Sequence, residues 1–180
     1  MSSFNMLMDE LRKIDLSHDD NWFATLEQRK KAEGDFHDQM RDQARFSQVS
    51  GDTFEEFYTN RRFYRTAKNS REYFYSWLDK HVRDKVVLDY ACGDGKQAIY
   101  SAKAGAKYVI GIDISAISIE NARKEAIAAG VSDRTYFLRG DCEHSGLPDS
   151  SVDVVACAGG TTGPVKTQSR LAILNEPVHS

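Results

Sequence analysis

The feature that most constrains the fold is the stretch Lys85–Gln97, which reads KVVLDYACGDGKQ. An apolar run ends in Asp89 and is followed by a glycine-rich turn and then by a helical pattern of apolar residues. This order predicts a strand, a tight loop and a helix N-terminus, where unpaired N–H groups and the positive end of the helix dipole face whatever lies above the loop. Gly93 and Gly95 suit backbone angles that other residues avoid, and they let a ligand approach the main chain closely. The stretch therefore predicts a site for a nucleoside-containing cofactor.

Two classes of cofactor fit this loop. Gly93, Gly95 and Ala98 match the spacing G-x-G-x-x-G/A, which is typical of loops that hold the pyrophosphate of a dinucleotide at a helix N-terminus. A carboxylate at Asp89, at the strand end beside the loop, would repel a pyrophosphate and attract a cation. S-adenosylmethionine carries an ammonium and a sulfonium group and has no phosphate. The acidic strand end therefore favours this methyl donor over a nicotinamide cofactor.

The run Val87–Gly95 resembles the first motif of class I S-adenosylmethionine-dependent methyltransferases, an acidic residue followed by G-x-G-x-G, with Ala91 in place of the first glycine. The resemblance extends from about Lys85 to Gly159. It implies a Rossmann-like parallel sheet, S-adenosyl-L-methionine as the cofactor and methyl transfer as the reaction. The cofactor-binding residues that it implies in this stretch are Asp89, Ala91, Cys92, Gly93 and Gly95.

The composition is ordinary for a globular protein and argues against several other classes. The chain has 180 residues and a net charge of −3, so a basic nucleic-acid-binding surface spread over the whole molecule is not indicated. The three cysteines, Cys92, Cys142 and Cys157, lack C-x-x-C spacing and indicate reduced thiols. No apolar leader and no segment of membrane-spanning length is seen. We expect a cytoplasmic protein with no metal site, no nucleic-acid partner and no membrane contact.

The first 82 residues are predicted to form a helical region. Residues 1–17 have the apolar spacing of a short amphipathic helix. Asp19, Asp20 and Asn21 are predicted to cap a second helix from about Trp22 to Phe46, which Gly34 would bend or break. Its interior is strongly polar, so we expect a solvated helix that docks through a few aromatic and apolar side chains.

The segment between residues 53 and 65 is rich in aromatic and basic side chains. These side chains either pack a helix against the following domain or cover the cofactor as a lid, because methyltransferases of this class often have N-terminal helices over the donor pocket. A basic and aromatic surface of this kind also suits single-stranded nucleic acid. The candidate lid residues are Tyr58, Arg62 and Tyr64. Asn69 and Glu72 are predicted to cap a further helix that ends near His81.

From Lys85 onward strands alternate with helices, which is the pattern of a parallel sheet covered by helices. The second strand, Tyr108–Ile112, is followed by Asp113, about 20 residues after the glycine loop, where a carboxylate can accept hydrogen bonds from both hydroxyls of a ribose. The alternative role for Asp113 is a helix N-cap, although Ser115 is the better cap for the helix predicted at Ala116–Ala129. Asp113 and Ile114 are the binding residues expected here.

A third strand is predicted at Thr135–Arg139, followed by Gly140, Asp141 and Cys142. The family resemblance implies that Asp141 accepts a hydrogen bond from the adenine amino group and that the backbone N–H of Cys142 serves adenine N1. An ordinary loop acid is the alternative for Asp141. The run Gly146–Val155 resembles the segment that precedes and opens the fourth strand in small-molecule methyltransferases of the type-11 group. That resemblance implies a small-molecule methyl acceptor.

The resemblance stops after Gly159. Methyltransferases of this class continue with three more strands, whereas residues 160–180 hold one short apolar cluster. We expect an irregular tail from about residue 160, a sheet truncated after the fourth strand, Val152–Cys157, and hence a C-terminally incomplete methyltransferase. Because an interior strand left at an edge exposes unpaired backbone groups, we also expect marginal stability or a homodimer through that edge.

Together these patterns predict an α/β protein with two parts: a helical region, residues 1–82, and a Rossmann-like cofactor-binding domain, residues 83–180. The predicted function is methyl transfer from S-adenosyl-L-methionine to a small molecule, with activity in question if the sheet is truncated. The alternatives are a non-catalytic module that binds the donor or its product, and an NAD(P)-dependent oxidoreductase. The sequence identifies no catalytic base; His144 is either a base or a surface loop residue.

Overall fold

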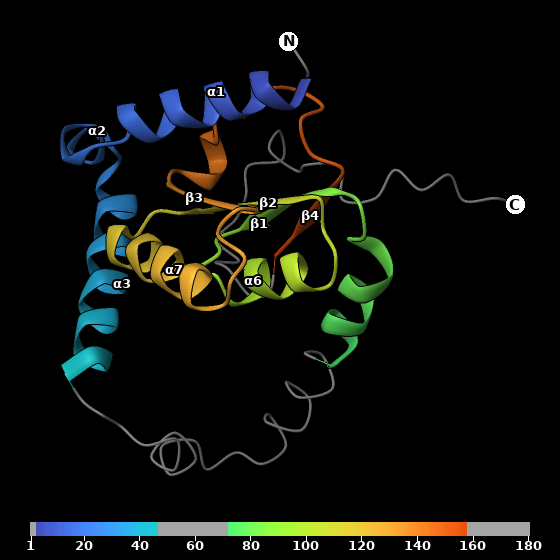
Figure 1. The fold of residues 1–180 in the computed structure, drawn as a ribbon. Coiled ribbons are helices and arrows are strands. Elements are labelled where there is room, and N and C mark those ends of the chain that lie inside the picture. The colour runs from blue at the N-terminus through green and yellow to red at the C-terminus, as the bar shows by residue number, and fades with distance from the viewer. Residues whose placement is uncertain (1–2, 47–71, 158–180) are drawn as a thin grey trace, which may run out of the picture.

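The computed structural model describes residues 3–46 and 72–157, which form a parallel sheet with helices on both faces (Figure 1). The N-terminal helices are α1 (Ser3–Ser17), α2 (Asp20–Thr25) and α3 (Gln28–Phe46), and a further helix covers residues 72–81. The alternating elements that follow are β1 (Val86–Tyr90), α6 (Lys96–Lys103), β2 (Tyr108–Asp113), α7 (Ala116–Ala128), β3 (Thr135–Arg139), the 3-10 helix η1 (Cys142–His144) and β4 (Val154–Ala156). The candidate lid residues Tyr58, Arg62 and Tyr64 and the tail from residue 160 lie outside the described residues.

The sheet has four parallel strands in the order β3-β2-β1-β4. Leu88 of β1 pairs with Ile110 of β2 on one side and with Val155 of β4 on the other. The chain therefore builds outward from β1 through β2 to β3 and then returns to the opposite side of β1. In open α/β sheets, ligands bind outside the carboxyl ends of the strands where the order reverses in this way. The predicted Rossmann-like α/β class is confirmed, and a ligand is expected at the carboxyl ends of β1 and its neighbours.

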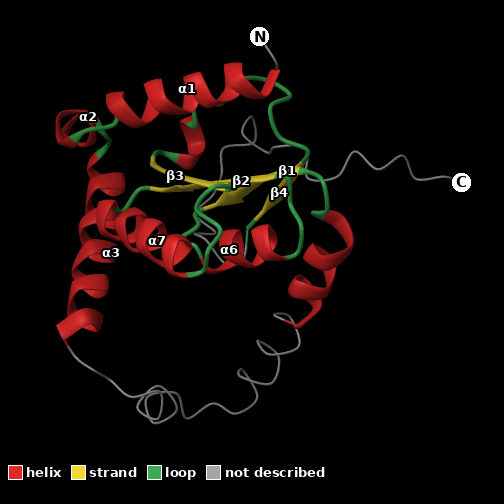
Figure 2. Cartoon of the chain, viewed as in Figure 1, coloured by secondary structure: helices red, strands yellow, loops and turns green. Residues whose placement is uncertain are grey.

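Helices from different parts of the chain cover the two faces of the sheet (Figure 2). On one face, Val87 and Val109 pack in a buried cluster with alanines of α6 and α7. On the other face, Leu88 and Ile110 pack in a second cluster with Leu7 and Leu11 of α1. Burying one such leucine is worth about 1.5–3 kcal/mol. As a result β2 is buried on both faces, which is typical of a parallel strand, and only Asp113 at its end is partly exposed.

The single helix predicted from Trp22 to Phe46 is wrong, because the structure has two helices that are separated near Leu26. The side chain of Asp19 caps α2 by accepting a hydrogen bond from the Trp22 N–H at 2.9 Å, and Leu26 takes an extended backbone that ends this short helix. Gly34, the predicted break, lies inside α3. A Cβ atom at Gly34 would be 2.8 Å from the ring of Phe23, so the glycine is needed for close packing of α2 on α3.

β4 is shorter than the predicted strand Val152–Cys157 and lies at an edge of the described sheet. Asp153 ends the pairing, because its side chain accepts a hydrogen bond from the Val86 N–H at 2.8 Å and its own N–H donates to the Val86 carbonyl. Val154 and Val155 are only partly buried. Pairing of two copies through this edge stays a prediction. Within residues 3–46 and 72–157, no helix is long and apolar enough to cross a membrane.

Candidate cofactor site

The glycine-rich loop lies at the carboxyl end of β1, next to the point where the strand order reverses. Three of its residues have left-handed backbone angles: Ala91 with φ 56°, Gly93 with φ 52° and Gly95 with φ 75°. The Cys92 N–H donates to the Ile112 carbonyl of β2 at 3.0 Å, which fixes the loop to the neighbouring strand. Gly95 then caps α6 without a side-chain hydrogen bond. The loop therefore presents backbone and no bulky side chain at its tightest turn.

An aromatic ring beneath the loop explains why two glycines are needed. A Cβ atom at Gly95 would be 2.8 Å from the Phe137 ring and 2.9 Å from the Ala122 Cβ, and one at Gly111 would be 2.5 Å from the Phe137 ring. Phe137 is buried at 3% exposure and fills the space between β2, β3 and the loop. The sequence reasoning missed both Phe137 and Gly111. The signal that could have found them was a glycine inside an otherwise apolar strand, which often marks a close approach.

Asp113 is held beside the loop by backbone donors. Its Oδ2 accepts a hydrogen bond from the Gly93 N–H at 2.8 Å, and its Oδ1 accepts one from the Ser115 N–H at 2.9 Å. A carboxylate offers about four acceptor positions, so each oxygen keeps one for a further donor. Ser115 is the N-cap of α7, as predicted, and accepts from the Ser118 N–H at 3.0 Å. Asp113 is therefore held in place by two backbone donors and keeps acceptor capacity beside the loop.

Asp89 lies under the loop and faces the start of α6. It is 2% exposed, it accepts a hydrogen bond from the backbone N–H of Ala98, and its Oδ2 has no hydrogen-bond partner among the described residues. Burial raises the pKa of Asp89 to about 7, and the negative charge of Asp113 acts in the same direction. In this structure the carboxylate is beneath the loop, not on the surface that a ligand would meet. A role for Asp89 in cofactor binding stays a prediction.

Asp141, at the end of β3, is paired with a lysine from α3. The ammonium group of Lys30 forms an ion pair with Asp141 Oδ2 and lies 2.8 Å from Glu143 Oε2. Asp141 Oδ1 accepts from the Glu143 N–H at 3.0 Å, and His144 Nδ1 lies 3.3 Å from Oδ2. Burial favours the neutral acid, but hydrogen bonds from Lys30 and Glu143 outweigh it and lower the pKa of Asp141. Lys30 is 6% exposed, so the expectation that its polar helix is solvated is wrong at this residue.

The remaining predicted residues surround these acids. Ile114 is partly buried, and its carbonyl accepts a hydrogen bond from Arg139 Nε at 3.1 Å. Cys92 and Cys142 are free thiols, and burial raises the pKa of both. The structure thus brings Ala91, Cys92, Gly93, Gly95 and Asp113 together at one edge, places Asp89 beneath them and joins Asp141 to α3.

Asp141, Glu143 and His144 have ligand-type atoms within 4.8 Å of one another, which is the spacing of a metal site. However, the Lys30 ammonium already lies on both carboxylates. The cluster is explained as an ion-pair network, and we assign no metal to it.

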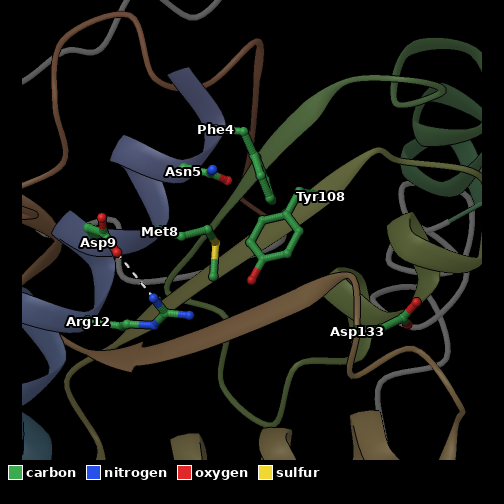
Figure 3. A pocket seen from close by; sticks show the side chains of 7 residues that line it. All are labelled: Phe4, Asn5, Met8, Asp9, Arg12, Tyr108 and Asp133. Atoms are coloured by element: carbon green, nitrogen blue, oxygen red, sulfur yellow. Dashed lines mark hydrogen bonds and ion pairs between the residues drawn. The ribbon is translucent and has the colours of Figure 1, made fainter. Parts of the chain in front are cut away.

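A hollow of about 480 Å³ lies at the other end of the strands, between α1 and the start of β2 (Figure 3). Phe4 packs edge-on against Tyr108 with 5.1 Å between the ring centres, and Asp9 pairs with Arg12 at 3.1 Å. Asn5, Met8 and Asp133 complete the wall that is seen in Figure 3. Because this hollow is at the amino ends of the strands, it is separate from the loop and from Asp113.

Sequence comparisons identify related proteins. Residues 87–178 match a family described as a methyltransferase domain. Protein arginine N-methyltransferase 1 of Saccharomyces cerevisiae is 45% identical over 73 residues, which cover 41% of this chain and 21% of that protein. Ribosomal protein L11 methyltransferase of Haemophilus influenzae is 41% identical over 91 residues, which cover 50% of this chain and 30% of that protein. The chain spans less than a third of the length of these relatives.

Two solved structures are also similar over part of the chain. The first is the Trypanosoma brucei PRMT1 enzyme–prozyme heterotetrameric complex with AdoHcy, with 32% identity and a TM-score of 0.43 over 47% of this chain and 27% of that chain. The second is an RNA methyltransferase from Salinibacter ruber in complex with S-adenosyl-L-homocysteine, with 29% identity and a TM-score of 0.42 over 46% of this chain and 55% of that chain.

Proposed function

The chain belongs to the methyltransferase domain family, and on this premise we propose that it binds S-adenosyl-L-methionine and takes part in methyl transfer. One observation carries the proposal. The carboxylate of Asp113 is fixed beside the glycine loop by the N–H groups of Gly93 and Ser115, and each oxygen keeps an acceptor position. A ribose diol donates two hydrogen bonds and matches these positions. The loop lies at the strand-order reversal, where a nucleoside ligand is expected.

Each residue has a role under this proposal. Asp113 holds the ribose, and the backbone of Ala91, Cys92, Gly93 and Gly95 lies along the middle of the cofactor. Asp141 accepts from the adenine amino group, the N–H of Cys142 serves adenine N1, and Ile114 packs against the base. Asp89 acts from below the loop, where its negative charge in the ionised form favours a cationic ligand.

When bound, the cofactor would supply a methyl group: the acceptor's nucleophile would bond to the methyl carbon as its bond to sulfur breaks, and S-adenosylhomocysteine would leave. The protein's part in such a reaction is mainly proximity and orientation, and a base is needed only where the acceptor has a high pKa. We assign no base. The side chain of His144 is 81% exposed and lies beside Asp141, which favours its interpretation as a surface loop residue.

Two classes of acceptor are candidates. The run Gly146–Val155 favours a small molecule, because it resembles the corresponding segment of small-molecule methyltransferases. A protein side chain is the second candidate, because the relatives named above are protein methyltransferases. A labelled methyl donor added to cell extract distinguishes them: label in the low-molecular-weight fraction supports the first class, and label in intact proteins supports the second.

Calorimetric titration with S-adenosylhomocysteine and with NAD tests the cofactor. We expect saturable binding of S-adenosylhomocysteine and none of NAD. Binding of NAD alone would replace the proposal with an oxidoreductase. Binding of S-adenosylhomocysteine without methyl transfer to either acceptor class would leave the non-catalytic binding module as the function.

Three further expectations belong to this proposal. They are the division into a helical region, residues 1–82, and a sheet domain, residues 83–180; a cytoplasmic location; and pairing of two copies through β4. Size-exclusion chromatography tests the third, because a monomer at high concentration would exclude it.

A further inference from the structure

One side of α3 contacts the loops that follow β2 and β3. Lys30 reaches Asp141 and Glu143 after β3, and Asp38 accepts hydrogen bonds from the Ser115 hydroxyl and, at 3.3 Å, from the Ile117 N–H after β2. Gly34 lies between them, and a Cβ atom there would be 3.8 Å from the Ile114 side chain. Residues four apart lie on the same side of a helix, so this contact surface is continuous. In Figure 1, α3 passes one end of α7 at a steep angle, in agreement with these contacts.

The Lys30–Asp141 pair is buried and uses most of the acceptor positions of Asp141. The side chains of Lys30 and Asp141 are 7% and 10% exposed. Asp141 Oδ1 receives the Glu143 N–H, and Oδ2 receives Lys30 and lies beside His144. About one acceptor position remains. An amino group arriving from a ligand therefore meets a carboxylate that is already occupied and covered.

We propose that α3 is a latch on the adenine subsite: Lys30 holds the Asp141 carboxylate in the ligand-free protein, and the adenine amino group displaces Lys30 when the cofactor binds. The latch rests on the proposed function, because the role of Asp141 is part of it. Its residues on α3 lie outside residues 87–178, the segment that matches the methyltransferase family.

Glu143 makes the displacement feasible. Its carboxylate is already 2.8 Å from the Lys30 ammonium, and its side chain is 28% exposed, compared with 10% for Asp141. When Lys30 leaves Asp141, it keeps a charged partner closer to solvent. A buried lysine left without any partner would be strongly unfavourable, and the second carboxylate keeps Lys30 paired in both arrangements.

The latch and a purely structural ion pair predict opposite signs for one variant. Lys30→Met removes the competitor for Asp141 and also removes a buried ion pair from the ligand-free state. Under the latch we expect Tm of the ligand-free protein to fall and the affinity for S-adenosylhomocysteine to rise by about tenfold, which corresponds to a latched form that makes up about nine-tenths of the free protein. A purely structural ion pair predicts that the Tm and the affinity for S-adenosylhomocysteine both decrease.

The experiment is calorimetric titration with S-adenosylhomocysteine, with Tm measured on the same samples. Lys31→Met is the matched control, because Lys31 is the next residue of α3 and donates to the Ala24 carbonyl at 3.1 Å, away from Asp141. The affinity of this control for S-adenosylhomocysteine is expected to stay within about twofold of wild type, a smaller change than coupling between two sites usually produces. Lys30→Gln, which keeps a donor without the charge, makes the same comparison if Lys30→Met does not fold. Unchanged or weaker binding by the Lys30 variants, with normal binding by wild type, overturns the latch alone. Failure of wild type to bind overturns the proposed function and the latch with it.

Discussion

Two carboxylates at the same edge of the sheet are held in different ways. Asp113, after β2, is held by the N–H groups of Gly93 and Ser115, which belong to the loops beside it. Asp141, after β3, accepts one hydrogen bond from the nearby Glu143 N–H, but its other oxygen is paired with the side chain of Lys30, 111 residues earlier in the chain. Backbone donors on a tight loop cannot turn away, whereas a lysine side chain has several rotatable bonds. Under the proposed function, the ribose end of the candidate site is therefore fixed by backbone groups alone, whereas one oxygen of the carboxylate at the adenine end depends on the position of α3.

The largest expected effect comes from Gly95→Ala, which changes the glycine loop at the fixed end of the site, beside Asp113. The new Cβ would meet Phe137 and Ala122 at 2.8–2.9 Å in a backbone conformation with φ 75°. The left-handed conformation and the overpacking together are expected to lower the free energy of unfolding by about 2–5 kcal/mol. Urea denaturation measures this loss.

Gly130→Ala is the matched control, because Gly130 has φ 70° and a Cβ atom added there would meet nothing within 4 Å. It should lose only the conformational part, about 1–2 kcal/mol. Equal losses for the two variants would show that Phe137 does not define the loop.

The second test concerns the charge beneath the fixed end. Because burial raises the pKa of Asp89 from 3.8 to about 7, the folded state holds this proton more tightly than the unfolded chain. The resulting stability is fully present below about pH 4 and is lost as the pH rises through 7, at a cost of about 4 kcal/mol. Asp89→Asn should remove this loss, so its free energy of unfolding should change little between pH 4.5 and 8.

Urea denaturation of wild type and Asp89→Asn between pH 4.5 and 8 measures how the free energy of unfolding of each protein changes with pH. The lowered pKa values of Asp141 and Glu143 affect stability in the opposite direction, since their contribution is lost as the pH falls below about 4. Asp133→Asn is the control, because Asp133 is exposed, and its free energy of unfolding should change with pH as that of wild type does. A wild-type stability that rises steadily toward pH 8 would contradict the assignment of Asp89.

The smallest expected effect compares the two carboxylates directly. Asp113→Ala leaves ribose hydroxyls unpaired and should weaken S-adenosylhomocysteine binding by about 1–3 kcal/mol. Asp141→Ala should weaken it less, because the variant loses the adenine acceptor and at the same time the residue that holds Lys30. Titrations of the two variants under one condition measure the difference. A larger loss for Asp141→Ala would mean that the adenine end is as fixed as the ribose end.

Local signals in the sequence were sufficient for much of the fold. Thr135–Arg139 is the strand that was predicted, and α7 begins after the predicted cap Ser115 and ends just before Gly130, because strand periodicity and helix caps act over a few residues. The partner of Lys30 could not be predicted in this way. A charged run such as that in α3 has the pattern of a solvated helix, and only the folded chain brings Asp141 to it.

The burial of Asp89 could have been predicted from the alternation of side chains along its strand. Successive strand residues point to opposite faces, so Asp89 shares the face of Val87, which packs beneath the helices that cross the sheet. This alternation predicts a carboxylate under α6, whereas the loop motif alone suggested one beside the ligand. The backbone positions of the candidate site could be predicted from the sequence. The burial of its carboxylates depends on packing between segments that are far apart in the chain.

The placement of α1 has a consequence for synthesis of the protein. His18, just after α1, contacts the Arg139 carbonyl at 2.8 Å, and Asp15 within the helix pairs with Arg123 at 2.9 Å. A ribosome that adds about 5–20 residues per second needs about ten seconds to reach β3 after it has made α1. During that interval the surface that Leu7 and Leu11 cover is incomplete, because Leu138 of β3 has not yet been added to Leu88 and Ile110. The two leucines are then accessible to chaperones or to other nascent chains. α1 can therefore complete its contacts with the sheet only after residues up to Arg139 have been made.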